Sequence, residues 1–278
     1  MGTLFAIRMA EAEIQPSRGP KRAHSREKLA ALAIRIADVE GLEAASIRRI
    51  AGELGSGAAS LYRYVANKQD LFDLMADSVL GEDRMPRSRR DWRADLRKAA
   101  SLWRAMYLRH PWMLTVSGFR MLNGTNLLRW VEFTLAAIDG HGLDIDEMLV
   151  LSNTLFAYAR GHAASEIGER EASVRSGMSR VEWMIEHAES TRSIVESERF
   201  PYFSKIVKDA ATPHREAMEE RGFREGLECL LDGFAVRLER EDRREGGSSR
   251  GRPQRRGNKP LVPEKLVPGA KPHLSSAN

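Results

Sequence analysis

Two short helical patterns separated by a glycine turn constrain the fold of this chain more than any other stretch. Residues 46–71 read SIRRIAGELGSGAASLYRYVANKQDL, with apolar positions at spacings of three and four on either side of LGSG. Ser46 can cap the first helix and Gly55 can end it. Helices shorter than about 12–15 residues are marginal alone in water. Both must therefore pack on a neighbour, and together they form a helix-turn-helix.

A further helix is expected on each side of this pair. Ser25 can cap the preceding helix, which Gly41 ends, and its apolar face holds Leu29, Leu32, Ala33, Ile36 and Val39. Asn67 can cap the following helix, whose apolar face holds Leu71, Leu74, Met75 and Val79. The predicted core comprises Leu29, Ile36, Ile50, Leu61 and Val65, and burying each side chain is worth about 1.5–3 kcal/mol.

The rest of the chain divides by pattern and charge. Helices are expected over 92–110 and near 112–122, 126–139, 144–168, 179–198, 201–211 and 217–240, and strand-like alternation is absent. The fold class is therefore all-α: a three-helix head joined through a fourth helix to a larger helical bundle. The predicted divisions are a flexible basic leader at 1–24, a helix-turn-helix domain at 25–70, a body at 71–240 and a disordered basic tail at 241–278.

The third helix carries side chains that suit double-stranded DNA. It is expected to present Ser60, Tyr62, Arg63 and Tyr64 outward, and such a helix fits the major groove. Arg63 can donate two hydrogen bonds to one guanine, and Ala58 and Ala59 can contact thymine methyl groups. The expected phosphate contacts are Ser46, Arg48, Ser60, Tyr64, Lys68 and the amide end of the helix at Asn67–Lys68. The alternative is a three-helix structural unit that does not bind DNA.

The same stretches resemble a known family. GLEAASIRRIAGELG and ASLYRYVANKQDLFDLM are similar to the DNA-binding domain of TetR family transcriptional regulators, over roughly residues 25–80. The resemblance implies that Tyr62 and Lys68 anchor the DNA backbone, and that Arg63 and Tyr64 lie in or beside the groove. RHPWM (109–113) and FREGLECLLDGF (223–234) resemble the tetracycline-repressor-type C-terminal domain. That resemblance implies a body that binds a small effector and pairs two subunits through a four-helix bundle. Residues 165–200 look like an insertion or lengthened helices.

Aromatic residues in the body suggest where an effector could bind. Pockets between bundled helices are lined mainly by aromatic and apolar groups with a few polar ones. The candidates are Trp103, Tyr107, His110, Trp112, Phe119, Phe133, Phe156, Tyr158 and His162. For each of them, ordinary core packing is the alternative. No metal or cofactor is expected.

The last helix has small residues along one stripe. Beside larger residues such as Leu230, this stripe contains Gly222, Gly226, Cys229 and Gly233. Glycine inside a helix costs about 1 kcal/mol relative to alanine, so these glycines need a reason. Close approach of a helix from a symmetric partner supplies one. Residues 217–240 are therefore predicted to form much of a homodimer interface.

The sequence as a whole favours a homodimeric regulator of transcription that a small molecule releases from a palindromic DNA site. Repression, rather than activation, rests on the resemblance alone. One alternative is a DNA-binding activator or architectural protein without an effector. An enzyme is not expected, because no Gly-rich phosphate loop, supported carboxylate pair or Ser/His/Asp arrangement is present. The single cysteine excludes an intrachain disulfide and suits the cytoplasm, and no apolar run is long enough for a membrane span.

Overall fold

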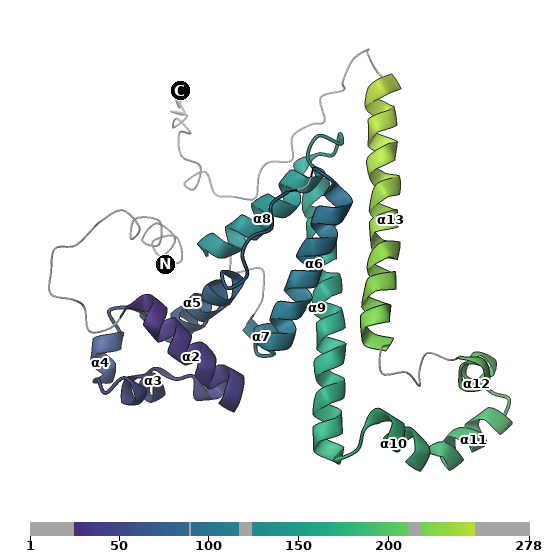
Figure 1. Ribbon diagram of the computed structural model, residues 1–278, viewed down its shortest axis with the longest axis horizontal. Coiled ribbons are helices and arrows are strands. Elements are labelled where there is room, and N and C mark those ends of the chain that lie inside the picture. Colours follow the sequence, from purple (N-terminus) through teal and green to yellow (C-terminus); the bar gives the residue numbers. More distant parts are fainter. Residues whose placement is uncertain (1–24, 89, 117–123, 211–217, 248–278) are drawn as a thin grey trace, which may run out of the picture.

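The computed structural model describes residues 25–88, 90–116, 124–210 and 218–247, and within these ranges the chain forms helices and no strand. The all-α prediction is confirmed, and none of the described helices is long and apolar enough to cross a bilayer. The elements (Figure 1) are α2 (Arg26–Glu40), the short 3-10 helix η1 (Leu42–Ala44), α3 (Ile47–Glu53), α4 (Ala58–Leu61), α5 (Lys68–Leu80), α6 (Trp92–Arg109), α7 (Met113–Val116), α8 (Thr125–Ile138), α9 (Ile145–Ser176), α10 (Arg180–Glu186), α11 (Ala188–Glu196), α12 (Pro201–Asp209) and α13 (Met218–Gly247).

The helices from α2 to α5 form a compact unit, here called the head. Ser25, Ser46 and Asn67 each accept a hydrogen bond from a backbone N–H three residues later, at 3.2, 3.2 and 2.9 Å. These caps begin α2, α3 and α5 where the sequence predicted. The five predicted core side chains are at most 4% exposed: Leu29, Ile36, Ile50, Leu61 and Val65. The short helices α3 and α4 are therefore held by packing rather than by their own length.

One residue of the predicted apolar stripe lies outside this core. Val39 is 79% exposed, so its placement in the stripe is wrong. The preceding Asp38 points at the body, where its carboxylate accepts a hydrogen bond from the indole N–H of Trp112 at 2.7 Å. Because successive helical residues point about 100° apart, the turn that aims Asp38 at the body leaves Val39 in solvent.

The body consists of α6–α9 and α13, with α6 packed along α9 and α8, and α13 packed on α9 (Figure 1). Its buried side chains include Leu96, Ala99, Met106, Leu151, Leu155, Ala159, Phe223, Leu227 and Leu231. Ion pairs join α6 to α13. Arg97 Nε lies 2.6 Å from the Glu228 carboxylate, and Arg93 Nη2 lies 3.0 Å from it. Hydrogen bonds from these two arginines lower the pKa of Glu228 to about 2. α13 is thus fixed to α6 as well as to α9.

Several body helices differ from their predicted bounds. Of the helix expected near 112–122, the structure describes only α7, and the one expected near 144–168 continues in α9 to Ser176. The helix expected near 179–198 divides at His187, whose ring stacks on Trp183. α13 continues to Gly247, so placing the start of the tail at residue 241 is wrong. Residues 241–245 read EDRRE, which suit a helix until the two glycines that follow. The leader at 1–24 and the tail at 248–278 lie outside the described residues.

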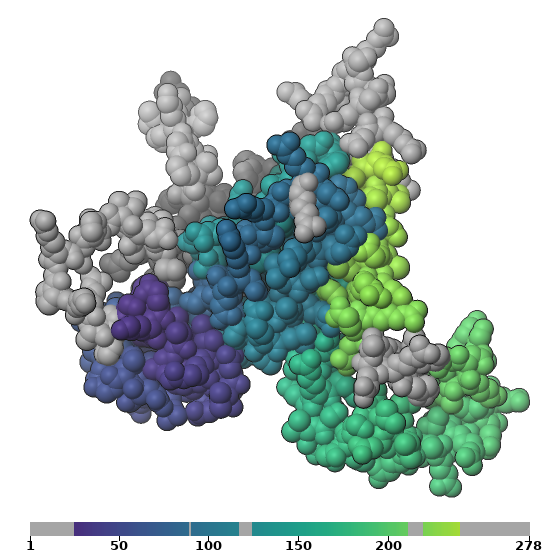
Figure 2. Space-filling view, viewed as in Figure 1, coloured from purple at the N-terminus to yellow at the C-terminus, as the bar shows by residue number. Residues whose placement is uncertain are grey.

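Residues 177–210, here called the arm, extend away from the bundle (Figures 1 and 2). The arm consists of α10, α11 and α12, and none of these helices contains a buried residue. It nevertheless carries many large apolar side chains, all of them exposed: Val181, Trp183, Ile185, Ile194, Phe200, Tyr202, Phe203, Ile206 and Val207. The arm therefore contributes nothing to the core of its own chain.

The head is joined to the body through α5. Asp77 accepts hydrogen bonds from the backbone N–H groups of Asn126 and Leu127, at 3.0 and 3.2 Å. These bonds cap α8, because Gly124 at the N-cap has no side chain to do so. A Cβ at Gly124 would lie 2.0 Å from the Asp77 carboxylate, so glycine is required there. Burial raises the pKa of Asp77, while its bonds to the two backbone N–H groups oppose that shift.

A second set of contacts surrounds His110. Its Nδ1 lies 2.8 Å from Asp38 of α2, and its Nε2 lies 2.9 Å from Glu82, just after α5. The ring is only 6% exposed. Arg109 forms an ion pair with Asp83 at 2.7 Å beside it. His110 therefore ties two elements of the head to the end of α6.

Candidate nucleic-acid interface and ligand site

The turn between α3 and α4 is tight and needs glycine. Gly55 has φ +61°, a left-handed conformation that residues with a Cβ rarely adopt. The N–H of Ser56 reaches back to the carbonyl of Ala51 at 2.9 Å and closes α3. Gly57 then precedes the four-residue helix α4. The two helices and this turn form the predicted helix-turn-helix.

Most of the predicted DNA-contact residues are accessible to solvent on the head. Arg48, Ala59, Tyr62, Arg63 and Lys68 are exposed, and Ser46, Ala58 and Ser60 are partly exposed. Two of the hydroxyls already have protein partners, because Ser46 caps α3 and Ser60 donates to the Gly57 carbonyl at 2.7 Å. A hydroxyl oxygen that donates one bond can still accept another. These contacts remain predictions.

Tyr64 is the exception. It was predicted to point outward, but it is only 7% exposed and belongs to the core of the head. Tyr64 and Val65 follow Leu61 by three and four residues, a spacing that places them on the face of Leu61 rather than on that of Tyr62. The same periodicity that identified Leu61 and Val65 as core could have placed Tyr64 there too.

The positive side chains around the helix-turn-helix differ in whether a carboxylate of the same chain already pairs with them. Arg49 pairs with Glu40 at 3.0 Å and Glu53 at 3.2 Å. Arg48 and Arg63 form no ion pair with any described residue, and Arg63 lies over the ring of Tyr64. Lys68 pairs with Glu43 at 2.6 Å, but both side chains are well exposed. Exposed pairs are worth about 0–1 kcal/mol, so Lys68 can exchange its carboxylate for a phosphate.

The predicted effector residues separate into three places. His110 and Trp112 belong to the contacts between head and body and do not line a site with the others. His162 lies against Tyr158 and Phe223, where α9 meets α13, and burial lowers its pKa. Phe119 lies outside the described residues. The remaining four, Trp103, Tyr107, Phe133 and Phe156, come together between α6, α8 and α9.

These four and Trp130 form one group of rings, here called the Trp103 cluster. The centroid of the Trp103 ring lies 4.0 Å from that of Phe156 and 6.1 Å from those of Tyr107 and Trp130. Phe133 joins through Trp130, at 6.3 Å. The sequence reasoning missed Trp130, although its position three residues before Phe133 on an amphipathic helix could have indicated it.

Packing within the chain explains one of the small residues on the stripe of α13. A Cβ at Gly226 would lie 2.5 Å from the Tyr158 hydroxyl of α9, which donates to the Phe223 carbonyl at 2.8 Å. The close approach of α9 in the same chain thus favours a small residue at position 226, and the place of Gly226 in a dimer interface stays a prediction. Gly222, Cys229 and Gly233 are exposed and Leu230 is partly buried. Those positions leave the outer face of α13 uncovered by its own chain.

Comparisons with known proteins bear on both regions. The family model described as "Bacterial regulatory proteins, tetR family" matches residues 29–75. The model described as "Tetracyclin repressor-like, C-terminal domain" matches residues 85–238.

Individual proteins match over much of their length. The HTH-type transcriptional repressor DrrR1 of Streptomyces coeruleorubidus is 36% identical, over 80% of this chain and 81% of its own. An HTH-type transcriptional regulator of Saccharopolyspora erythraea is 32% identical, over 55% of this chain and 67% of its own. The Streptomyces coelicolor TetR family protein ActR, solved in complex with actinorhodin, superposes with a TM-score of 0.61 at 26% identity, covering 77% of this chain and 96% of ActR.

Proposed function

The chain belongs to the TetR family of bacterial transcriptional regulators, and we propose that it acts as a homodimer whose two heads bind a palindromic operator. It is a ligand-responsive, DNA-binding transcriptional repressor, as its likeness to DrrR1 and to ligand-bound ActR indicates. Residues 25–70 are the DNA-reading domain, and residues 71–240 bind the effector and the second subunit. The protein works in the cytoplasm, where its operator is.

The observation that carries the DNA-reading proposal is the pair Tyr62 and Arg63 at the end of α4. Both are exposed and directly follow α4, which the glycine turn joins to α3. An arginine without a carboxylate partner is free to donate two hydrogen bonds to guanine in the major groove. Arg48, Tyr62 and Lys68 hold the phosphates on either side and set the register of the head.

Selection of bound duplexes from random DNA tests this assignment. The wild-type protein should select a palindrome whose half-sites lie about one helical turn apart or slightly more. Arg63→Ala should lose a guanine preference in each half-site, at a cost of about 1–3 kcal/mol. Arg49→Ala is the matched control: Arg49 is already paired with two carboxylates, so its loss should leave the sequence preference unchanged.

Two other results would redirect the proposal. Binding that is sensitive to salt but blind to sequence would identify an architectural DNA-binding protein instead. A palindrome that Arg63→Ala selects unchanged would keep the regulator and reject Arg63 as its base-reading residue.

The outer faces of α9 and α13 support pairing of two subunits. Gly161 and Gly168 on α9 and Gly233 on α13 have no neighbouring atom within 4 Å of an added Cβ. Small exposed residues on two adjacent helices allow two further helices to approach closely, which makes a four-helix bundle about a twofold axis. The exposed apolar side chains of the arm continue from the end of α9 and enlarge the surface available to the partner.

Gly233→Leu tests the interface more cleanly than a change at Gly226, which would also strike Tyr158 of the same chain. In the proposed dimer, a leucine at position 233 meets the partner helix, and overpacking of this kind should weaken association about tenfold or more. Sedimentation over a range of concentrations measures this loss, while circular dichroism checks that the helices persist. A Gly233→Leu protein that dimerises as tightly as wild type contradicts the proposed bundle.

Release from the operator follows from the contacts between head and body. A ligand that prefers one arrangement of the body shifts the population towards it, typically with a coupling of about 1–3 kcal/mol. Asp77 and the His110 contacts fix α5 and α2 to the body. A shift of α8 or of the end of α6 therefore moves the two α4 helices relative to each other, and their spacing no longer matches successive major grooves.

A further inference from the structure

Trp103 is the starting point, because its buried N–H group is unsatisfied. Its side chain is 8% exposed, and its Nε1 has no hydrogen-bond partner among the described residues. The other buried indoles are paired: Trp112 donates to Asp38 at 2.7 Å, and Trp130 donates to the Leu80 carbonyl at 3.0 Å. An indole nitrogen can only donate, and a buried donor that is left without an acceptor destabilises the fold. Such a group in a ligand-responsive protein indicates a missing acceptor.

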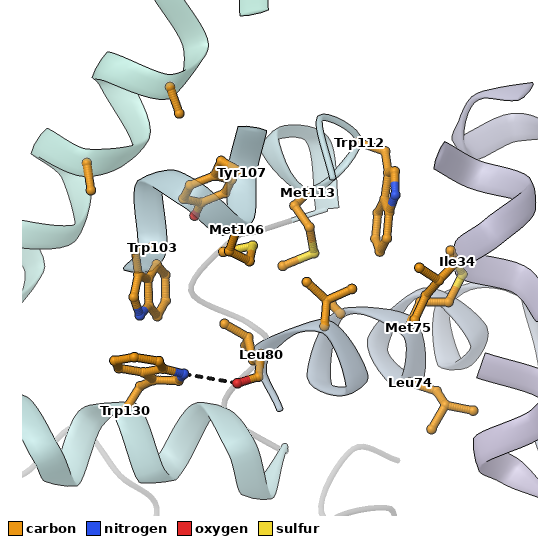
Figure 3. Close-up of a cluster of buried hydrophobic side chains, with 14 of the residues drawn as sticks. Ile34, Leu74, Met75, Leu80, Trp103, Met106, Tyr107, Trp112, Met113 and Trp130 are labelled. Carbon is orange, nitrogen blue, oxygen red and sulfur yellow. Dashed lines mark hydrogen bonds between the residues drawn. The ribbon is translucent and has the colours of Figure 1, made fainter. Parts of the chain in front are cut away.

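No described side chain supplies an oxygen acceptor for this N–H. The ring planes of Trp103 and Trp130 are nearly perpendicular, at 86°. In Figure 3 the indole nitrogen of Trp103 is on the side of its ring that faces Trp130. A contact between N–H and an aromatic ring is second-order compared with a bond to oxygen.

The rings around Trp103 determine what kind of molecule could supply that oxygen. Phe156 packs over Trp103 with 32° between the ring planes, while Tyr107 and Trp130 meet it edge-on. Phe133 and Phe156 are only partly buried, so this edge of the cluster is accessible to solvent. None of the five side chains carries a charge at neutral pH. Stacked and edge-on contacts of this kind suit flat aromatic rings.

We propose that the Trp103 cluster binds a flat, polycyclic aromatic ligand whose carbonyl or quinone oxygen accepts the hydrogen bond of Trp103 Nε1. This inference rests on the proposed function, since the ligand is the effector of the repressor. The rings of the ligand stack among Trp103, Phe133 and Phe156, where half-buried Phe156 can rotate aside. Trp103 is then the residue that distinguishes an oxygenated polycycle from a hydrocarbon of the same shape.

The cluster also has a direct connection to the head. Trp130, which meets Trp103 edge-on, holds the carbonyl of Leu80 at the end of α5 (Figure 3). A ligand that displaces the ring of Trp130 therefore displaces the helix that follows the DNA-reading α4. Trp130 is a positioning residue, which carries the effect of the ligand without supplying the acceptor's hydrogen bond.

Two matched probes test the proposal on the full-length protein. Anthraquinone-2-sulfonate and anthracene-2-sulfonate share three fused rings and one sulfonate, and only the first has carbonyl oxygens. Calorimetric titration of the wild type should show about tenfold tighter binding of the quinone, the size expected for one hydrogen bond to a buried donor. Trp103→Phe keeps a flat ring and removes the N–H, so it should abolish this preference and bind the two probes with equal affinity.

Two tryptophan variants serve as controls. Trp112→Phe removes an indole N–H at the contact between head and body and should leave the quinone preference intact. Trp130→Phe should bind the quinone probe within about threefold of wild type, the range left when no direct hydrogen bond is lost, but release operator DNA less completely. If Trp130 only stabilised the fold, Trp130→Phe would weaken probe binding and operator release together.

The titrations and the variant each have an outcome that would overturn the proposal. Binding of neither probe to the wild type rejects the ligand class, and so does equal binding of both probes. If Trp103→Phe retains the quinone preference, Trp103 is not the donor; if the variant does not fold, the two wild-type titrations decide. Operator binding is measured on the same samples without probe. Specific operator binding without probe binding rejects only this inference, whereas its absence rejects the proposed function itself.

Discussion

The head and the arm are built from helices of similar size but differ in what covers them. In the head, α3 has seven residues and α4 four, and each buries apolar side chains in the shared core. In the arm, α10 has seven residues and α11 and α12 nine each, and none buries any. Both begin a helix with a serine cap, at Ser46 and Ser179. Helical pattern and capping therefore establish that a helix forms, and they do not establish what it packs on.

The exposed apolar side chains of the arm also indicate what the arm could pack against. Soluble monomers rarely leave large contiguous apolar surfaces exposed. The arm exposes Trp183, Phe200 and Phe203 together with several branched side chains. Such a surface is suited to burial against a second subunit, as the proposed homodimer provides. The stability of the arm should then depend on association, while that of the head should not.

The largest expected effect comes from truncating one buried side chain in the head and one exposed side chain in the arm. Leu61 is fully buried, so Leu61→Ala should lower the free energy of unfolding by about 2–5 kcal/mol. Ile185 is 70% exposed, so Ile185→Ala should change it by less than about 0.5 kcal/mol in the dissociated chain. Urea denaturation at low protein concentration measures both.

Repeating the experiment at high protein concentration sharpens the comparison. If the arm packs on a partner, Ile185→Ala should become destabilising as the dimer forms, while the effect of Leu61→Ala stays the same. A loss of several kcal/mol from Ile185→Ala at every concentration would mean that the arm packs on its own chain.

Local sequence patterns predicted the head well, because its determinants are close together in the chain. Ser25, Ser46 and Asn67 cap groups three residues away, and the buried positions of α2 and α5 repeat at helical spacing. Helical spacing also explains why the outward orientation predicted for Tyr64 is wrong, since Tyr64 follows Leu61 by three residues and is buried with it. Val39 is exposed because the end of α2 turns Asp38 towards a residue 74 positions later.

The ligand site could be predicted only as a list of aromatic residues. Spacing along the chain cannot show that His110 bonds to Asp38, 72 residues away, while Trp103 meets Phe156 across two different helices. Asp77 capping α8 from 49 residues away is equally invisible to a local pattern. Which of the aromatic residues form one group depends on how the helices pack, and that is a property of the whole fold.

A smaller effect is expected from exposed tyrosines, one in each region. Tyr62 is 53% exposed on the proposed DNA surface, and Tyr202 is 82% exposed on the arm. Tyr62→Phe removes a hydroxyl that can donate to a phosphate, so operator affinity should fall by about 1 kcal/mol, or roughly fivefold. Tyr202→Phe should leave it unchanged. Fluorescence anisotropy with labelled operator measures both, and an equal loss from the two variants would remove Tyr62 from the interface.

The smallest expected effect is a pH dependence with opposite signs in the two regions. Burial raises the pKa of Asp77 above its ordinary value of 3.8, so the folded head binds a proton more tightly than the unfolded chain does. The contribution of Asp77 to stability therefore falls as pH rises from 3.8 through the raised pKa, and is constant above it. Asp77→Asn keeps an oxygen that accepts from the α8 backbone and has no proton to exchange. Its stability relative to wild type should thus increase across that window.

Glu182 in the arm supplies the opposite case. Its hydrogen bonds to Ser179 lower its pKa from 4.5, so its contribution is present above pH 4.5 and is lost as pH falls through the lowered value. Glu182→Gln should remove that acid sensitivity, and only locally, because α10 contributes nothing to the core. Urea unfolding of both variants and wild type between pH 3 and 7 checks the signs. If the stability of Asp77→Asn relative to wild type instead decreased as pH rises, the bonds from Asn126 and Leu127 would outweigh burial, and the cap on α8 would itself favour the charged carboxylate.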